Sequence, residues 1–280
     1  MSSVWRSKYF QSKLEHALRT ALVAEKICTV DRSDSKYIQN PYQTAQTATV
    51  QAVSGTYAIA SWTTTDDALT VADEVYNAAH VFDFESVLSN FNLLSDIMED
   101  MAAQVAISID KAVLNITLEE GTGTYSTPAG GFTTAANWAV IVGDLLSKFA
   151  GFAESYKGMY LVVENTDVTG IVQSQMASGF NFADSALRNG LISTQAGLDI
   201  YVVRSGTFAN YTPGSFGAVT NSGHRLAGIK GQTVYAAPRG LQYIEKEVSG
   251  KTGKEIAIFG YFGVHTWVPK QGLVIDITIA

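Results

Sequence analysis

The sequence predicts a mixed α+β protein organised around one very long helix. Three observations predict this class. Residues 85–118 carry apolar side chains at steps of three and four, with no Gly or Pro between them, which is the pattern of an amphipathic helix. Residues 135–203 alternate helical and strand-like spacing, as α/β segments do. Residues 233–279 contain a succession of strand-like segments, so the chain ends in β structure.

The N-terminal segment, residues 5–27, has the apolar spacing of an amphipathic helix. Most of its charges are positive, and they come from Arg6, Lys8, Lys13, Arg19 and Lys26. Two interpretations stay open. The segment is either a helix docked on the body with a solvated basic face, or an arm that reaches a neighbouring subunit or an internal partner.

Residues 34–81 predict a long polar β-hairpin. Two strand-like runs, residues 43–53 and 56–60, flank the turn signal Ser54-Gly55. Neither run has enough large apolar side chains to bury a face, and an isolated two-stranded hairpin is only marginally stable in water. The hairpin therefore either folds back on its own core or lies across a neighbouring chain. Further strands are expected at residues 69–71 and 79–82.

The long helix, residues 85–118, is expected to act as a strut. At a rise of 1.5 Å per residue its ~34 residues span roughly 50 Å, far beyond an ordinary globular helix. A membrane span is excluded because Asp96, Glu99 and Asp100 would lie at bilayer depth. A coiled coil is disfavoured because the polar Ser108 interrupts the seam. The residues expected to form its core are Phe91, Leu94, Met98, Met101, Val105 and Ile109.

After the long helix the sequence predicts a loop, an α/β region and a second loop. Both loops, residues 119–134 and 206–223, are rich in Gly, Ser and Thr. Between them the spacing predicts helices over residues 138–156 and 167–176, and buried strands over residues 159–163 and 198–203.

The C-terminal segment is expected to contain only strands, at residues 233–237, 241–248, 256–268 and 273–279. In the last strand Leu273, Ile275, Ile277 and Ile279 alternate onto one face. In the strand before it the aromatic side chains share one face, which we expect to pack into the core. These residues are Phe259, Tyr261, His265 and Trp267.

Composition points to a protein that buries surface against other chains. Apolar residues make up 46% of the 280 residues and charged residues only 16%, below the usual quarter. The net charge of −7 excludes condensation of nucleic acid by the chain as a whole. The single Cys28 excludes an intrachain disulfide framework and suits a reducing compartment, and no run of apolar residues is long enough to span a membrane.

Signatures of enzymes are absent or fortuitous. The Lys251-Thr252-Gly253 triplet and the Ser33–Lys36 SxxK pattern resemble parts of penicillin-binding enzymes, but no SDN triplet lies between them. The four histidines have no metal-ligand spacing, and no glycine-rich motif joins a strand to a helix. We therefore expect no catalytic residues, no cofactor and no metal. An α/β enzyme without a recognisable site stays the alternative from a different functional class.

The order of these parts resembles a known family. A basic arm, a long polar hairpin, the strand-to-helix stretch Val81-Phe-Asp-Phe-Glu85, and the helix-ending pattern Ile109-Asp-Lys-Ala-Val-Leu114 follow one another, and an α/β region and a β tail close the chain. This order is similar to the major capsid proteins of tailed bacteriophages, which have the Hong Kong phage type fold also used by encapsulins.

The resemblance implies a division of the chain into an N-terminal arm, an extended loop, a peripheral domain with a spine helix, an axial domain, and a return to the peripheral domain. The corresponding ranges are 1–33, 34–80, 81–134, 135–246 and 247–280. The extended loop would overlap an adjacent subunit. Its expected contact residues are Tyr42, Thr47, Thr49, Val50, Val53, Tyr57, Ile59 and Trp62.

By the same resemblance the protein is a structural component that self-assembles into pentamers and hexamers of an icosahedral shell around double-stranded DNA. The implied partners are other copies of the chain, a separate scaffolding protein, a portal, and DNA held without sequence specificity. No membrane or small-molecule substrate is implied. The expected location is the virion capsid, assembled in the host cytoplasm. An encapsulin-type compartment is the alternative within the same fold.

Overall fold

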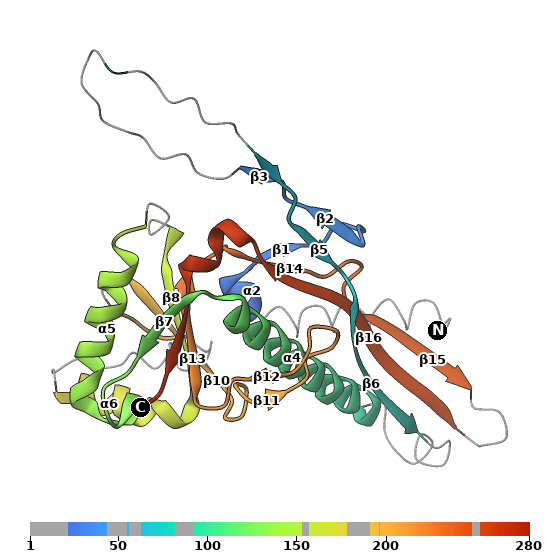
Figure 1. Cartoon of the computed structure of the whole chain (residues 1–280). Coiled ribbons are helices and arrows are strands. Elements are labelled where there is room, and N and C mark those ends of the chain that lie inside the picture. Colours follow the sequence, from blue (N-terminus) through green and yellow to red (C-terminus); the bar gives the residue numbers. More distant parts are fainter. Residues whose placement is uncertain are drawn as a thin grey trace.

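The computed structural model describes residues 22–43, 55, 63–81, 92–152, 157–177, 191–195, 197–247 and 253–280, with backbone only for residues 92–96, 174–177 and 191–195. Within these ranges the protein is a mixed α+β molecule with two main sheets on either side of one long helix (Figure 1).

The larger sheet has six strands in the order β7-β17-β13-β8-β10-β9. Their bounds are β7 Gly123–Ser126, β8 Met159–Glu164, β9 Leu191–Gln195, β10 Leu198–Val203, β13 His224–Ile229 and β17 Val274–Thr278. The central strands β8 and β10 are parallel, and β13 runs antiparallel to both β8 and β17. Parallel pairing at the centre matches the near-continuous apolar sequence of β8, because such strands are buried on both faces.

Both faces of the six-stranded sheet are covered by the chain itself. Along β8, Leu161 and Val163 pack with helices α5 (Ala135–Phe149) and α6 (Val168–Ala177). The alternate residues Tyr160 and Val162 belong to the cluster that contains the long helix α4, residues Asn92–Glu120. Because successive side chains of a strand point to opposite faces, alternate residues of β8 contribute to two different cores.

The smaller sheet is built on the long strand β16. Its members are β1 Thr29–Asp31, β6 Asp73–Val81, β14 Thr233–Ala236, β15 Gln242–Glu247 and β16 Lys254–Thr266. Strands β6, β14 and β15 are all antiparallel to β16, and β1 is parallel to β14. On β16 the buried Ile258 and Phe262 share a core cluster with Met101 and Val105 of α4. Helix α4 therefore covers one face of this sheet.

Two short antiparallel ladders lead away from the body beside β14 (Figure 1). They pair β2 (Tyr37–Gln39) with β5 (Ala68–Thr70), and β3 (Tyr42–Gln43) with β4 (Thr64–Thr65). We call these two ladders, with the turn at Asp66–Asp67, the hairpin base. The hairpin strands expected at residues 43–53 and 56–60 fall almost wholly outside the described residues.

Helix α4 contains 29 described residues, and it ends at Glu120, two residues beyond the prediction. The predicted start at Glu85 lies outside the described residues. One segment of α4, Ile97–Glu120, is long and apolar enough to cross a membrane, but 67% of it is buried inside the protein. Its apolar character is thus accounted for by core packing.

The described N-terminal residues are held by a buried carboxylate. Asp110 of α4 accepts hydrogen bonds from the backbone N–H groups of Val23 (3.0 Å) and Ala24 (2.9 Å) at the start of α2 (Ala24–Ile27). Burial raises the pKa of Asp110 to about 6. Two backbone donors offset part of the cost of burying this charge. The remainder of the helix expected over residues 5–27 lies largely outside the described residues.

The structure corrects several sequence-based expectations. The expected loop over residues 119–134 contains β7, which pairs with β17, and a short 3-10 helix at Gly131–Thr133. The expected loop over residues 206–223 contains the small ladder of β11 (Asn210–Tyr211) with β12 (Val219–Thr220). These strands pair with distant or very short partners, so their own sequences carry little signal. Helix α5 ends at Phe149, before the predicted end at residue 156.

Two further short helical turns connect the larger elements. A 3-10 turn at Asn165–Asp167 joins β8 to α6, and another at Val268–Leu273 joins β16 to β17. Strand β17 was expected to bury one face only. In the structure Ile275 and Ile277 pack toward α5 while Val274 packs toward α4, so this strand too is buried on both faces.

Candidate assembly surfaces

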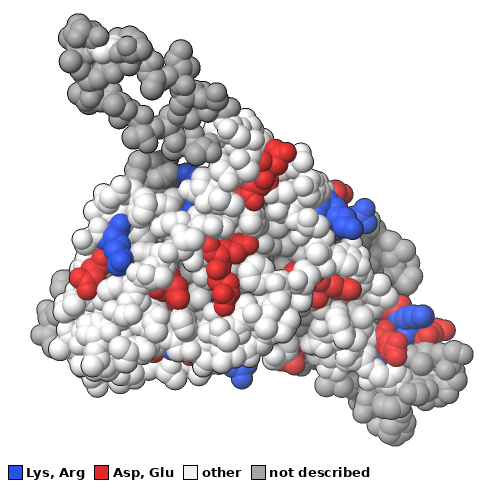
Figure 2. All heavy atoms as spheres, in the orientation of Figure 1, with Lys and Arg blue, Asp and Glu red and all other residues white. Residues whose placement is uncertain are grey.

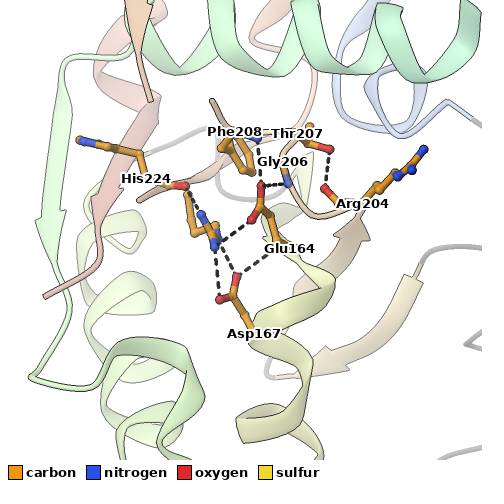
Figure 3. A network of polar contacts seen from close by, with 8 residues as sticks. Glu164, Asp167, Arg204, Gly206, Thr207, Phe208 and His224 are labelled. Atoms are coloured by element: carbon orange, nitrogen blue, oxygen red, sulfur yellow. Dashed lines mark hydrogen bonds and ion pairs between the residues drawn. The ribbon is translucent and has the colours of Figure 1, made fainter. Parts of the chain in front are cut away.

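A buried ionic network lies at the C-terminal end of β8 (Figure 3). The Arg225 guanidinium donates from Nε to Asp167 Oδ2 at 2.5 Å and from Nη2 to Glu164 Oε2 at 3.2 Å. Its Nη1 donates to the carbonyl oxygen of His224 at 2.7 Å. All three charged side chains are less than 10% exposed.

The same network fixes a loop of the chain. Glu164 Oε1 accepts the backbone N–H groups of Gly206 (3.0 Å) and Phe208 (3.1 Å), and the Phe208 ring lies 5.8 Å from the guanidinium carbon of Arg225. Every contact in the network is made to another part of the fold. We interpret it as a structural tie between β8, β13 and the loop at residues 204–208, with no oxygen or nitrogen placed for a substrate.

Among the described residues no group of His, Cys, Asp and Glu is arranged to hold a metal ion. The surface shown in Figure 2 has broad areas without charged side chains. Among the charged side chains on this side, acidic ones are more prominent than basic ones. The side of the molecule shown there does not favour contact with a polyanion.

Among the described residues no layer covers the face of the smaller sheet opposite α4, and this face carries several large apolar side chains. We call it the aromatic face, and it consists of Tyr76 on β6, Ile244 on β15, and Phe259 and Tyr261 on β16. Tyr76, Ile244 and Tyr261 are 73%, 47% and 44% exposed. Tyr76 lies directly opposite Phe259 in the β6–β16 ladder, so these two side chains point to the same side. The rings of Phe259 and Tyr261 meet edge to face at 6.0 Å.

The sequence-based assignment of this side of β16 to the core is wrong for Tyr261, which is 44% exposed, whereas Trp267 packs against a small buried cluster. Both faces of β16 are apolar in sequence, because Ile256, Ile258 and Phe262 alternate with Phe259 and Tyr261. Only one face can lie against α4, and the structure gives that position to Ile258 and Phe262, while Ile256 on the same side is 2% exposed. The sequence did contain a signal for this. Both faces of β16 are apolar and, in the described structure, only one long helix covers the sheet, so one apolar face had to remain without a helix.

A hollow of about 560 Å³ adjoins the aromatic face where the hairpin base meets the body. Tyr261 forms part of its wall, with Thr70 from the hairpin base and Arg239 from the turn before β15. Arg239 pairs with Asp34 at 3.5 Å, and both side chains are 69% exposed. The apolar face and the hairpin base therefore meet in one recessed surface.

The structure describes only part of the predicted contact set. Tyr42 is half-buried on β3, where it pairs with Thr65 of β4. The other seven predicted contact residues lie outside the described residues. Of the expected core residues of the long helix, Met98, Met101, Val105 and Ile109 are at most 4% exposed. Phe91 and the side chain of Leu94 lie outside the described part.

Comparison with known proteins finds structures of similar fold but no relatives by sequence. No protein-family model matches the sequence, and no curated protein matches it significantly. The structure is similar to the capsid of cyanophage P-SCSP1u, with a TM-score of 0.67 and 13% identity over 92% of this chain and 88% of that one. It is also similar to the mature capsid of bacteriophage PhiM1, with a TM-score of 0.68 and 12% identity over 92% and 87%.

A virus-like particle from Pyrococcus furiosus is similar as well, with a TM-score of 0.63 and 8% identity over 97% of this chain and 99% of that one. At these identities the likeness concerns the fold alone. The protein therefore has the fold of phage capsid proteins of the Hong Kong phage type, over nearly the whole chain.

Proposed function

We propose that this protein is the structural subunit of a closed icosahedral shell, built from pentamers and hexamers of the chain and enclosing double-stranded DNA. The observation that carries the proposal is the match of nearly the whole chain to phage capsids at TM-scores of 0.67 and 0.68. In this proposal α4 is the spine helix of a peripheral domain, and residues 135–246 form the axial domain.

The uncovered aromatic face supports self-association. Apolar patches of this kind on a folded chain mark surfaces that another protein covers. Only 16% of the residues are charged, so little on this surface opposes contact between copies. We place the aromatic face, the adjoining hollow and the hairpin base in contacts between subunits, where apolar aromatic residues are enriched.

The proposed relation to DNA is indirect. With a net charge of −7 the chain cannot hold a genome by bulk electrostatic attraction. Filling of the shell would then depend on a portal and an external motor, and assembly on a separate scaffolding protein. In this proposal the shell forms in the host cytoplasm and becomes the capsid of the virion.

The direct test is electron microscopy and sedimentation of the expressed chain, alone and with candidate scaffolding proteins. The proposal expects closed particles tens of nanometres wide. A stable monomer of about 30 kDa under every condition would refute it.

A protein compartment without a genome is the second candidate. The likeness to the archaeal virus-like particle favours it, because that match spans 97% of this chain. The two candidates differ in what the particles would contain. Particles purified from the native source that carry nuclease-protected double-stranded DNA support the capsid, and particles that carry protein cargo support the compartment.

A further inference from the structure

Three elements that are far apart in the sequence meet where the hairpin base leaves the body. Asp67 lies in the turn between β4 and β5, Glu120 is the last residue of α4, and His265 lies near the end of β16. The His265 ring is held between the two carboxylates. Its Nε2 lies 2.7 Å from Asp67 Oδ1, and its Nδ1 lies 2.7 Å from Glu120 Oε1.

When both partners are carboxylates, this geometry requires a charged imidazole. A neutral imidazole donates from one nitrogen only, whereas an imidazolium donates from both. The three side chains are shielded from water, with 18%, 8% and 11% exposure for His265, Asp67 and Glu120. In this setting a neutral ring would leave one carboxylate facing a nitrogen lone pair.

The second oxygen of each carboxylate is also engaged. Asp67 Oδ2 accepts the backbone N–H of Val268 at 2.7 Å, and Glu120 Oε2 accepts the backbone N–H of Thr266. The carbonyl oxygen of Asp67 accepts the N–H of Asn40 at 2.8 Å. Asp67 is thus bonded to both sides of the hairpin base and to the body at the same time.

Among the described residues the hairpin base makes one further buried apolar contact with the body. It is a cluster of Leu69, Val71, Val234 and Ala236, with Ile38 and Trp267 packed against it. The Trp267 ring also meets the His265 ring edge to face at 5.3 Å. At Gly263 an added Cβ would lie 2.9 Å from the carbonyl oxygen of Thr70, so the backbones of β16 and β5 approach each other closely there.

We propose that Asp67, His265 and Glu120 form a latch that fixes the direction of the hairpin base relative to α4, and that the latch opens when His265 becomes neutral. The direction of the hairpin base is then set by one proton. That the latch also tunes contact between subunits rests on the proposed shell function, whereas the latch itself does not.

The electrostatic surroundings agree with this geometry. The hydrogen bond to Glu120 is the main cause that raises the pKa of His265 to about 9, with Asp67 adding to it and burial opposing it. The charged groups that face the ring are Glu120 from α4 and Asp67 from the β4–β5 turn, and the uncharged Trp267, just after β16, packs against it. The latch is closed at neutral pH and opens above about pH 9.

The test measures the distance between the hairpin base and the body by electron paramagnetic resonance. Spin labels are placed at the exposed Thr64 on β4 and Val140 on α5, as T64C and V140C. Cys28 is buried and burial raises the pKa of its thiol, so it stays unlabelled. Labelled chains are diluted with unlabelled ones, so that distances within one chain are measured in a monomer or a particle alike.

At pH 7.5 the parent protein is expected to give one narrow distance distribution. Titration of the parent to pH 10, and H265Q at pH 7.5, should each shift or broaden that distribution by several ångströms. D67N provides a second variant if H265Q fails to fold. The matched control is H224Q, because His224 pairs with a single carboxylate, Asp276, at 2.8 Å, and lies at the start of β13, away from the hairpin base.

An unchanged distribution in the parent at pH 10 and in the folded variants would overturn the latch. So would titration of the His265 ring near pH 6.5 in a nuclear magnetic resonance experiment. Failure of the chain to form particles leaves this readout intact and refutes only the proposed function. Particles with an unresponsive hairpin base would refute only the latch.

Discussion

The two main sheets differ in how far the chain covers them. In the six-stranded sheet both Tyr160 and Leu161 are buried, since α4 covers one face and helices α5 and α6 cover the other. In the smaller sheet Phe262 is 5% exposed against α4, while its neighbour Tyr261 on the opposite face is 44% exposed. One sheet is completed by its own chain, and the other has an apolar face with no covering layer in the described structure.

We interpret the two sheets as serving different roles, one in the stability of the subunit and the other in contact between subunits. The six-stranded sheet, tied by the Arg225 network, supplies the stability of the subunit. The smaller sheet keeps an apolar face that a second chain can cover. Helix α4 lies between them and contributes to the core of both, so a defect in α4 affects both regions and defects elsewhere affect one.

The largest effect is expected for V105D. Val105 is 1% exposed in the core of α4, and an unpaired carboxylate there should cost on the order of 4 kcal/mol or more and abolish soluble folding. Circular dichroism and soluble yield measure this. Q104E, on the exposed side of the same helix turn, should change the free energy of unfolding by less than about 0.5 kcal/mol. Equal tolerance of both would remove α4 from the core.

R225L should damage the six-stranded sheet alone. It leaves Glu164 and Asp167 buried without their cation, which should cost about 3–5 kcal/mol in the free energy of unfolding measured in urea. R239A removes an ion pair whose members are both 69% exposed, and it should cost less than about 1 kcal/mol. If the two variants lose similar stability, the network does not hold the sheet together.

A pH series sharpens the comparison at the hairpin base. The pKa of His265 is about 9 in the folded protein against 6.5 ordinarily. A base with a raised pKa contributes stability that is fully present below pH 6.5 and is lost as pH rises through about 9. The melting temperature of the parent should exceed that of H265Q by several degrees at pH 6.5, as expected for up to about 3 kcal/mol, and the gap should close by pH 10. A gap that stays constant from pH 6.5 to 10 would contradict the assignment.

Much of this architecture follows from local sequence, and the remainder depends on partners far along the chain. The periodicity of α4 and the apolar run of β8 predicted a helix and a buried strand at these places. Both patterns can be recognised within one continuous stretch of sequence. Strands β1 and β7 were missed from sequence because they are short and form their hydrogen bonds with strands far along the chain. Strand β9, which pairs with the neighbouring strand β10, was missed as well.

The candidate surfaces were harder to predict than the fold. Phe259 and Tyr261 looked like core residues, since hydropathy gives both faces of β16 the same character and only the position of α4 separates them. Asp67, Glu120 and His265 lie on separate segments with unremarkable neighbours, and no spacing rule joins them. The exposed aromatic face and the Asp67, His265 and Glu120 cluster both depend on how distant segments pack together in the fold.

The smallest effect on subunit stability, and the largest on assembly, is expected for the double variant Y76S/Y261S. Both side chains are exposed in the subunit, so its free energy of unfolding should change by less than about 1 kcal/mol. The control V140S alters an exposed apolar residue of α5, away from the aromatic face.

Sedimentation velocity of the parent, Y76S/Y261S and V140S, under conditions in which the parent forms particles, tests the central claim most directly. The account predicts particles for the parent and V140S, and folded subunits or small oligomers for Y76S/Y261S. Particles of normal size and yield from a folded Y76S/Y261S variant would contradict it, because the aromatic face would then have no part in joining one copy to the next.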